Sequence, residues 1–248
     1  MSINLSKIPT RAPKEFDKDE TKTKLVSILG ELDDLQNLLY ANRKHSVLVI
    51  IQGMDASGKD GAVKNVFGTL NPLGVVAKSF KAPTEEELSY DFLWRIHKNV
   101  PAKGMIQIFN RSQYEDVLIT RVHKWINDET AYKRMEAINN FEMLLQQHNQ
   151  TIILKFYLHI SQEKQQERLN ERLTNVKKHW KANSNDFKEA KLYADYMKAY
   201  EECFENCNFV PWTIVPSDQN WYKEYIIAFT LLEALKKLDM KYPAVNEE

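Results

Sequence analysis

Apolar residues recur at helical spacing near the start of the chain and then give way to short, uninterrupted apolar runs. Residues 16–44 carry a stripe of leucine and isoleucine side chains, which predicts a long helix. The next apolar run, residues 47–51, is too short for a helix and is apolar throughout, as a strand buried on both faces should be. Residues 1–15 hold two prolines and no sustained period, so we expect an N-terminal arm there.

Strand-like and helix-like segments alternate along the rest of the chain. The pattern predicts further strands at residues 75–80, 105–109, 152–158 and 212–215. It predicts helices from residue 59 onward and at 85–98, 114–126, 131–148, 162–173, 186–207 and 221–238. Such alternation is typical of an α/β fold, with a parallel sheet covered by helices on both faces. We therefore expect a single domain over residues 1–248, with a mobile charged segment at about residues 162–185.

Composition and charge narrow the classes of protein that fit this pattern. Lys+Arg and Asp+Glu both total 34, so the formal net charge is zero, which argues against nucleic acid or a membrane as partner. The two cysteines, Cys203 and Cys207, form no disulfide framework and lack nearby ligands for zinc. No aliphatic run approaches the length of a bilayer span, and the lysine-rich start has no signal-peptide core. We expect a soluble cytoplasmic protein.

A glycine-rich turn joins the first predicted strand to the next helix. Residues 53–60 read Gly-Met-Asp-Ala-Ser-Gly-Lys-Asp and match the pattern G-x4-G-K. In such a loop the backbone N–H groups and the helix N-terminus face one anion, and Lys59 reaches the terminal phosphates. The alternative is an ordinary glycine-rich turn with a surface lysine, which the strand–loop–helix context disfavours. The predicted phosphate-binding residues of the loop are Gly53, Ala56, Ser57, Gly58, Asp60 and Gly61.

Two carboxylates set this loop apart from the nucleotide-binding consensus. Asp60 replaces the usual Ser or Thr that helps to hold Mg²⁺, and Asp55 lies inside the loop. A bare carboxylate about 4 Å from a phosphate charge would repel it by about 4 kcal/mol at an effective dielectric near ~20. A divalent cation between them, or a proton taken from the acceptor, removes this conflict. We expect Asp55 to act as metal ligand or base, while Asp60 serves the same site or caps the helix.

A second polar cluster follows the strand predicted at residues 105–109. It reads Asn110-Arg111-Ser112, with Glu115 shortly after, and it falls where ligands bind in open parallel sheets. Because the strand ends in an asparagine, Glu115 is the carboxylate that could reach back to a metal ion. Arg111 would stabilise the phosphoryl group during transfer. The alternative is a plain helix start, with Ser112 as N-cap and Glu115 in a capping box, and the two interpretations are compatible.

A basic segment between residues 164 and 181 is the third candidate feature. Arg168 and Arg172 are four residues apart and so share one helical face. A basic lid that closes over phosphates would exclude water and neutralise charge, whereas the plainer alternative is a solvated helix face. We expect a lid, with Lys178 as a further phosphate contact. Additional candidates for a groove that holds a long polyanion are Lys64, Lys81, Arg121 and His123.

These motifs together resemble those of the family-2 polyphosphate kinases, over about residues 10–240. The matching segments are the loop at 53–59, Phe80-Lys81-Ala82-Pro83 with the acidic stretch after it, residues 91–95, and Asn110-Arg111-Ser112-x-Tyr114-Glu115. Most of the family carries Asp at the position of Asn110. The Asn form with a downstream Glu resembles the third class, which phosphorylates both AMP and ADP. The resemblance implies a P-loop kinase-like fold and transfer from inorganic polyphosphate to AMP or ADP, giving ADP and ATP in a reversible reaction.

The sequence therefore predicts a phosphotransferase whose catalytic residues are Asp55, Lys59, Arg111 and Glu115. Asp55 and Glu115 are the predicted metal ligands, for Mg²⁺ or, as an alternative, Mn²⁺. Two rival functions are an ATP-dependent nucleoside monophosphate kinase and a non-catalytic regulator that binds polyphosphate. The leucine stripe at residues 25–39 packs either on its own core or on a partner subunit, and we expect a dimer or tetramer. The tryptophans expected in the core are Trp94, Trp125 and Trp221.

Overall fold

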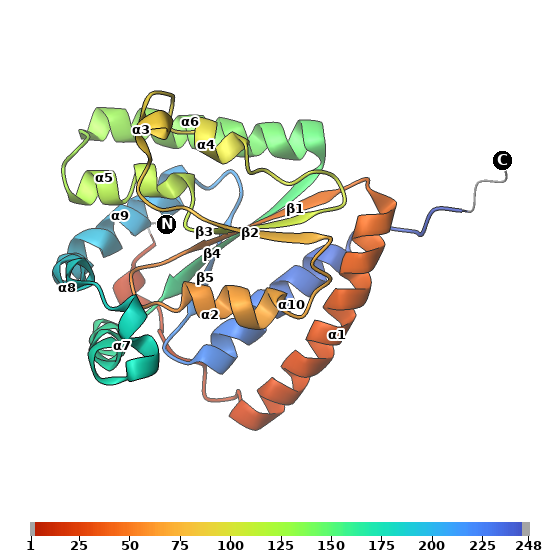
Figure 1. Ribbon diagram of the computed structural model, residues 1–248, viewed down its shortest axis with the longest axis horizontal. Coiled ribbons are helices and arrows are strands. Elements are labelled where there is room, and N and C mark those ends of the chain that lie inside the picture. The colour runs from red at the N-terminus through yellow and green to blue at the C-terminus, as the bar shows by residue number, and fades with distance from the viewer. Residues whose placement is uncertain (1–2, 245–248) are drawn as a thin grey trace.

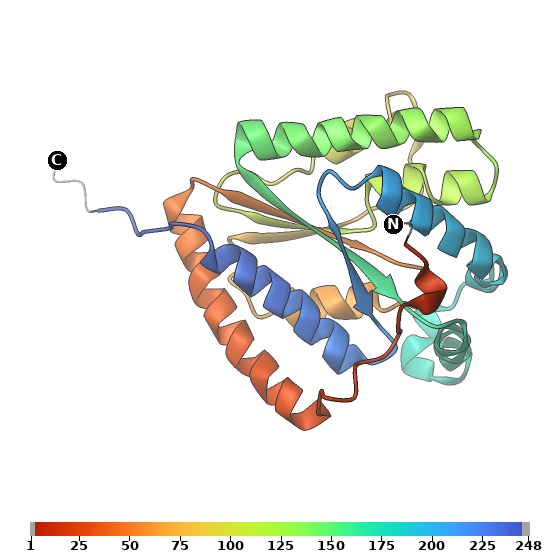
Figure 2. The same cartoon turned by 180° about the vertical axis from the view of Figure 1, so that it is seen from behind.

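The computed structural model describes residues 3–244 as a parallel sheet between two layers of helices (Figures 1 and 2). Its five strands, in the order β2-β3-β1-β4-β5, confirm the predicted α/β fold. The strands are β1 (Ser46–Gln52), β2 (Val75–Ser79), β3 (Ile106–Asn110), β4 (Thr151–His159) and β5 (Trp212–Pro216). Every neighbouring pair is parallel, so the carboxyl ends of all the strands lie at one edge of the sheet.

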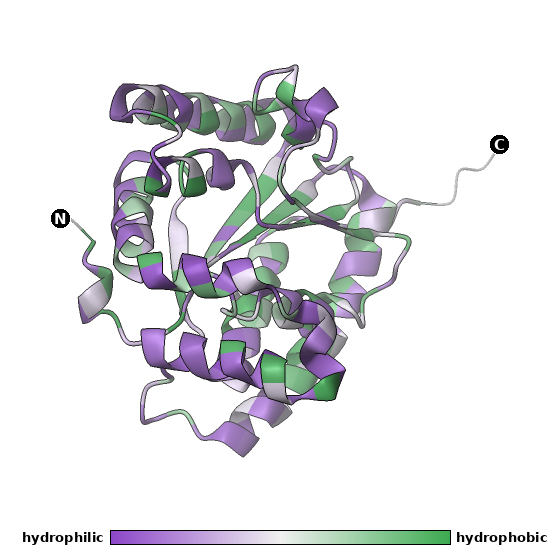
Figure 3. Ribbon diagram, turned by 60° about the vertical axis from the view of Figure 1, so that its left-hand side comes forward, coloured by the Kyte–Doolittle hydropathy of each residue, from purple (hydrophilic) through white to green (hydrophobic). Residues whose placement is uncertain are grey.

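Alternate side chains of β1 enter two separate hydrophobic cores, one on each face of the sheet. Val49 and Ile51 belong to the core that is covered by α1 (Lys18–Asn42), α10 (Asn220–Lys236) and the short α2 (Lys59–Ala62). Leu48 and Ile50 belong to the core on the opposite face. The helices on that face include α6 (Asp128–Asn149) and α9 (Tyr193–Asn206). Apolar residues are accordingly concentrated in the strands, while the helices carry polar residues outward (Figure 3).

The leucine stripe of α1 packs on the chain's own core. Leu25, Leu32 and Leu39 are buried in the same core as the inward side chains of α10. Of the two alternatives left open for this stripe, the structure therefore supports packing within the chain. Assembly into a dimer or tetramer stays a prediction.

Three predicted helices are interrupted. The segment 85–98 forms two single turns, α3 (Glu85–Leu88) and α4 (Trp94–His97). Between them the Asp91 carboxylate accepts the backbone N–H of Leu93, a local turn that competes with continued helix. The segment 114–126 is a 3₁₀ turn (Gln113–Asp116) followed by α5 (Ile119–Val122), and the segment 186–207 divides into α8 (Ser184–Glu189), a 3₁₀ turn and α9.

The prediction that Trp125 lies in the core is wrong. Its side chain is 66% exposed because the residue follows the end of α5 instead of lying on a buried helical stripe. There it stacks on the ring of His123, with centroids 5.1 Å apart. Trp94 and Trp221 are half-buried.

The N-terminal arm is docked against the sheet. Its short 3₁₀ turn, Leu5–Lys7, buries Leu5 completely. His159, at the end of β4, has its Nε2 atom 3.1 Å from the carbonyl oxygen of Leu5, and Thr10 donates a hydrogen bond to Asp218. The first residues of the described chain thus lie beside the carboxyl ends of β4 and β5. Over residues 3–244, no helix is both long enough and apolar enough to cross a membrane.

Candidate active site

The glycine-rich loop lies at the carboxyl end of β1, where it opens into a cavity of about 970 Å³. Gly58 takes a left-handed φ of 95°, and a Cβ there would come within 2.5 Å of the Lys223 ammonium, so only glycine fits without a shift. Lys59 begins α2 and folds back over the loop, where its Nζ donates hydrogen bonds to the carbonyls of Gly53 (2.6 Å) and Met54 (3.0 Å). The loop therefore places the Lys59 ammonium beside the N-terminus of α2, as a phosphate site requires.

Burial, followed by the nearby charge of Arg111, lowers the pKa of Lys59 to about 8, against the opposing effects of Asp55, Glu115 and Asp60. This lysine therefore titrates just above neutral pH. A phosphate anion bound beside it would favour the charged form.

This pKa makes anion binding dependent on pH. The charged fraction of a group with a pKa of about 8 falls roughly tenfold between pH ~7 and pH ~9. We expect the Kd for tripolyphosphate, measured by calorimetry without metal, to rise over this interval by up to about tenfold more than it does for Lys59→Met. The variant is the matched control because tripolyphosphate ionises identically in both titrations. Equal pH dependence in the two proteins would contradict the prediction.

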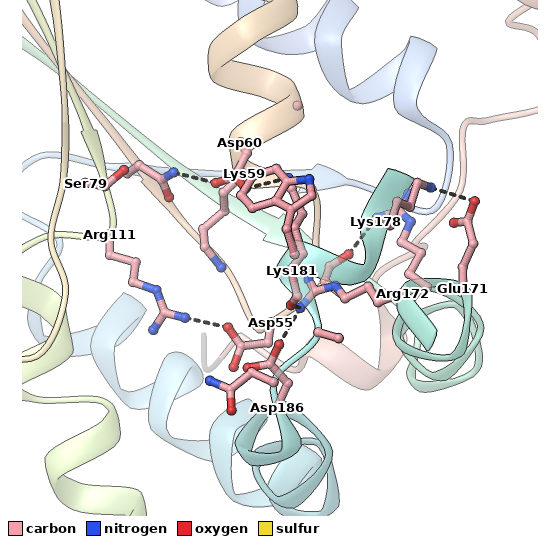
Figure 4. A pocket seen from close by; sticks show the side chains of 18 of the residues that line it. Asp55, Lys59, Asp60, Ser79, Arg111, Glu171, Arg172, Lys178, Lys181 and Asp186 are labelled. Atoms are coloured by element: carbon pink, nitrogen blue, oxygen red, sulfur yellow. Dashed lines mark hydrogen bonds and ion pairs between the residues drawn. The ribbon is translucent and has the colours of Figure 1, made fainter. Parts of the chain in front are cut away.

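Arg111 directly follows the carboxyl end of β3, the strand beside β1. Its backbone adopts a left-handed φ of 63°, an uncommon conformation for a side chain of this size. The guanidinium pairs with Asp55 (Figure 4). It also pairs with Glu115, from which it is 3.0 Å away. The charge of Glu115, more than any other group, raises the pKa of Arg111, which therefore remains cationic.

A buried network anchors the segment that follows Arg111. Tyr114 donates to Glu142 of α6 over 2.6 Å, and Lys155 of β4 donates to both Tyr114 (2.8 Å) and Glu142 (2.9 Å). The side chains of Lys155 and Glu142 are fully buried. Just before Tyr114, Ser112 caps the 3₁₀ turn by accepting the N–H of Tyr114, so the N-cap is confirmed, but Glu115 faces Arg111 and forms no capping box.

Asp60 connects the loop to the basic segment. Its carboxylate accepts hydrogen bonds from Asn110 (2.9 Å) and from Lys181 (2.8 Å). Burial alone would raise the pKa of Asp60, but these two hydrogen bonds and the charges of Lys181 and Lys59 together outweigh it and lower the pKa. The side chain caps no N–H of α2, although it lies in the first turn, where negative charge is favourable.

The basic segment runs from α7 (Gln162–Thr174) through a 3₁₀ turn, Val176–Lys181, to α8. Arg168 donates to the carbonyls of Ala56 (3.0 Å) and Ser57 (3.1 Å), so it holds the outer side of the phosphate loop. Arg172 pairs with Asp186 in the cavity wall. Lys178 and Glu171 form an ion pair of 2.6 Å (Figure 4).

The cavity brings together most, but not all, of the predicted site residues. Those that line it are Asp55, Ala56, Gly58, Lys59, Asp60, Gly61, Lys81, Arg111, Arg168, Arg172 and Lys178. Gly53 and Glu115 line a small adjoining cavity with Asp55 and Arg111, and Ser57 is completely buried in the loop.

Three predicted phosphate contacts lie away from the cavity lining. Lys64 is exposed on the helical turn after α2. Arg121 is held by Asp128 (2.8 Å) and Glu202 (2.7 Å), because its helix α5 packs against α9. His123 lies 3.0 Å from Glu189. The structure thus separates these three side chains from the phosphate loop.

Lys223 of α10 is a cavity residue that sequence reasoning missed. It is 1% exposed, and its Nζ donates to the carbonyl of Gly58 (3.1 Å) and to Asn220 (3.0 Å). Burial, followed by the charge of Arg168, lowers the pKa of Lys223 to about 8. The local sequence is a mostly apolar helix start, so no motif signalled this position.

The donor set at the cavity suits a hard divalent cation. Asp55 and Asp60 offer carboxylate oxygens beside the phosphate loop, and Asn110 offers an amide oxygen. No cluster of three His, Cys, Asp or Glu side chains that could enclose a metal occurs among residues 3–244. Mg²⁺ needs no such cage, since it is usually held by one or two carboxylates together with waters and substrate phosphates. The residues present therefore fit Mg²⁺.

A glycine-rich loop between a buried central strand and a helix, on a parallel sheet with a basic segment above it, defines a kinase of the P-loop class. The chain matches the family model "Polyphosphate kinase 2 (PPK2)" over residues 15–243 and belongs to that family, so it is a phosphotransferase of the polyphosphate kinase type. The resemblance seen in the motifs is thereby confirmed.

Individual relatives agree with this family. The chain is 43% identical over 242 residues to the AMP/ADP-polyphosphate phosphotransferase of Meiothermus ruber, covering 93% of this chain and 90% of that one. It is 39% identical to the ADP-polyphosphate phosphotransferase of Rhodopseudomonas palustris, covering 97% and 88%. The crystal structure of polyphosphate kinase 2 from Arthrobacter aurescens superposes with a TM-score of 0.95 at 39% identity, covering 99% of this chain and 89% of that one.

Proposed function

We propose that this protein transfers the terminal phosphoryl group of inorganic polyphosphate to AMP and to ADP, giving ADP and ATP. Similarity to the Meiothermus ruber enzyme, whose name includes both nucleotides, supports this choice of acceptors. In each turnover the terminal P–O–P bond of the polymer breaks, and a bond forms between that phosphorus and an oxygen of the acceptor phosphate. Because one phosphoanhydride replaces another, the reaction runs in both directions.

The observation that carries the proposal is the number of cations around one cavity. Lysines and arginines from the loop, from the strand ends, from the basic segment and from α10 line the same space of about 970 Å³. A donor chain and an acceptor nucleotide together carry many negative charges, and such a wall of cations counters them. The cations that line it are Lys59, Lys81, Arg111, Arg168, Arg172, Lys178, Lys181 and Lys223.

The residues divide the work of transfer between them. The loop amides and Lys59 hold the phosphates, and Arg111 stabilises the charge that spreads over the phosphoryl group in transit. Asp55, now paired with Arg111, orients the attacking acceptor oxygen and accepts its proton when it carries one. The basic segment at 162–185 acts as a lid that excludes water from the transfer.

Asp55 and Asp60, with Asn110 beside them, would hold Mg²⁺, or Mn²⁺ in its place. Bound there, the ion would neutralise phosphate charge between the carboxylates and the substrates. Glu115, the other carboxylate predicted as a metal ligand, pairs with the same Arg111 as Asp55 and lines the small adjoining cavity, so it stays a candidate ligand.

A chromatographic assay of products tests this function. We expect the protein, Mg²⁺, AMP and long-chain polyphosphate, with no ATP present, to yield ADP first and ATP later. EDTA should abolish the reaction, and excess Mg²⁺ or Mn²⁺ should restore it. A protein that phosphorylates AMP only when ATP is supplied would instead be a nucleoside monophosphate kinase. Binding of polyphosphate without turnover of either acceptor would indicate a regulator.

A further inference from the structure

One wall of the cavity carries a large aromatic surface that the phosphate chemistry does not use. Trp180, in the 3₁₀ turn Val176–Lys181, lines the cavity with its side chain 79% exposed. The other aromatic residue in the lining, Phe80, is only 3% exposed. Apart from Trp180, the cavity wall offers charged, polar and small side chains, so the indole provides its one broad apolar face among the described residues.

The indole is held in position by its own turn. Its Nε1 donates to the carbonyl of Lys177 over 3.1 Å, and the ammonium of Lys181 lies 4.9 Å from the ring centroid. Lys181 in turn contacts Asp60 at 2.8 Å, in the first turn of the helix that follows the phosphate loop. The exposed ring is thus tied to the end of the phosphate site while its surface stays open to the cavity.

We propose that Trp180 is the stacking surface for the purine base of the acceptor nucleotide. This inference rests on the proposed function, which brings two ligands into the cavity. Of the two, polyphosphate has no apolar or planar part, so it gains nothing from an indole face. The nucleotide carries a flat π-system, for which an aromatic side chain is the general partner, and a purine offers a larger stacking area than a pyrimidine. Trp180 therefore contributes to acceptor affinity and to preference for purines.

The rival use of an exposed tryptophan on a surface turn is contact with another protein, including a second copy of this chain. The position of the ring in the cavity lining and its tether to Asp60 favour the base. Under the rival use, removal of the ring would weaken association of subunits and leave nucleotide affinity unchanged.

Calorimetric titration of AMP into Trp180→Ala tests the proposal without requiring turnover. We expect the Kd for AMP to rise by about 5- to 150-fold, the range of base–aromatic stacking, while the Kd for tripolyphosphate changes less than about twofold. Trp180→Phe should retain most of the AMP affinity. The ratio of affinities for AMP over CMP should fall in Trp180→Ala. Val176→Ala is the matched control, since Val176 lies in the same turn, is 78% exposed and does not line the cavity.

Unchanged AMP affinity in Trp180→Ala would overturn the proposal, and so would an equal loss for AMP and tripolyphosphate. These results are distinct from failure of the proposed function. If wild-type protein bound AMP through Trp180 but made no ADP from polyphosphate, the stacking role would stand and the reaction would be wrong.

Discussion

Arg111→Met is expected to lower kcat for phosphoryl transfer from polyphosphate to AMP by about 10³-fold, since arginines that stabilise a transferring phosphoryl group contribute about 10³ to 10⁵ in kcat. The side chain reaches the cavity from the end of β3, and the left-handed backbone at this residue aims it toward the loop. Its guanidinium is at present shared by Asp55 and Glu115. Removing it deletes the cation and leaves these two carboxylates without their counterion.

Steady-state kinetics with each substrate varied separate the effect on kcat from the effect on KM. The fall should occur mainly in kcat, because Arg111 is expected to bind the transferring group more tightly in the transition state than in the ground state. Arg11→Met is the matched control, since Arg11 is exposed in the N-terminal arm and should behave as wild type. A change of less than about tenfold in kcat for Arg111→Met would refute the assigned role.

Glu142→Leu is expected to lower the free energy of unfolding by about 3–5 kcal/mol, the usual loss when one partner of a buried ion pair is removed. Lys155 would then keep a fully buried charge with the Tyr114 hydroxyl and one backbone carbonyl as its remaining partners. For a protein of this size, the loss corresponds to a fall in Tm of roughly 6–20 °C. Thermal unfolding followed by circular dichroism measures it.

The double variant Glu142→Leu/Lys155→Met distinguishes an unpaired charge from poor packing. Replacing both charges by apolar groups removes the uncompensated ammonium, so we expect it to recover most of the lost stability. On the exposed side of the same helix, Glu129 pairs with Lys133, and Glu129→Gln should change stability by no more than about 0.5 kcal/mol. Stability in the double variant as low as in Glu142→Leu would show that shape, not charge, governs this site.

The strands and the phosphate loop were predictable because their signals are local. A fully buried parallel strand reads as an uninterrupted apolar run, and β1 is buried along its whole length. The breaks in the helices were not predictable in this way, because they depend on local hydrogen bonds that compete with those of the helix. Between α3 and α4, for example, the Asp91 carboxylate accepts the N–H of Leu93, a local hydrogen bond that competes with continued helix. The spacing of apolar residues carries no information about such a local hydrogen bond.

The candidate site shows the same division between local and distant information. The loop, Arg111 and the basic segment were recognisable from motifs, whereas Lys223 lies 165 residues beyond its partner Gly58. Only the parallel topology, which brings α10 to the end of β1, places this ammonium in the cavity. Arg121 illustrates the converse. It lies close to Arg111 in sequence, but the break in the predicted helix turns it toward Asp128 and Glu202.

Carbonyl oxygens of the phosphate loop accept hydrogen bonds from residues that are synthesised long after the loop itself. Ser57 accepts hydrogen bonds from Arg168 and from the Ser217 hydroxyl, which follow it by 111 and 160 residues, and Gly58 accepts one from Lys223. A nascent chain that ends before α10 contains the whole loop but lacks Lys223, whose ammonium donates to the Gly58 carbonyl. We therefore expect the loop to reach its anion-binding geometry only after α10 has been synthesised and has packed against the sheet.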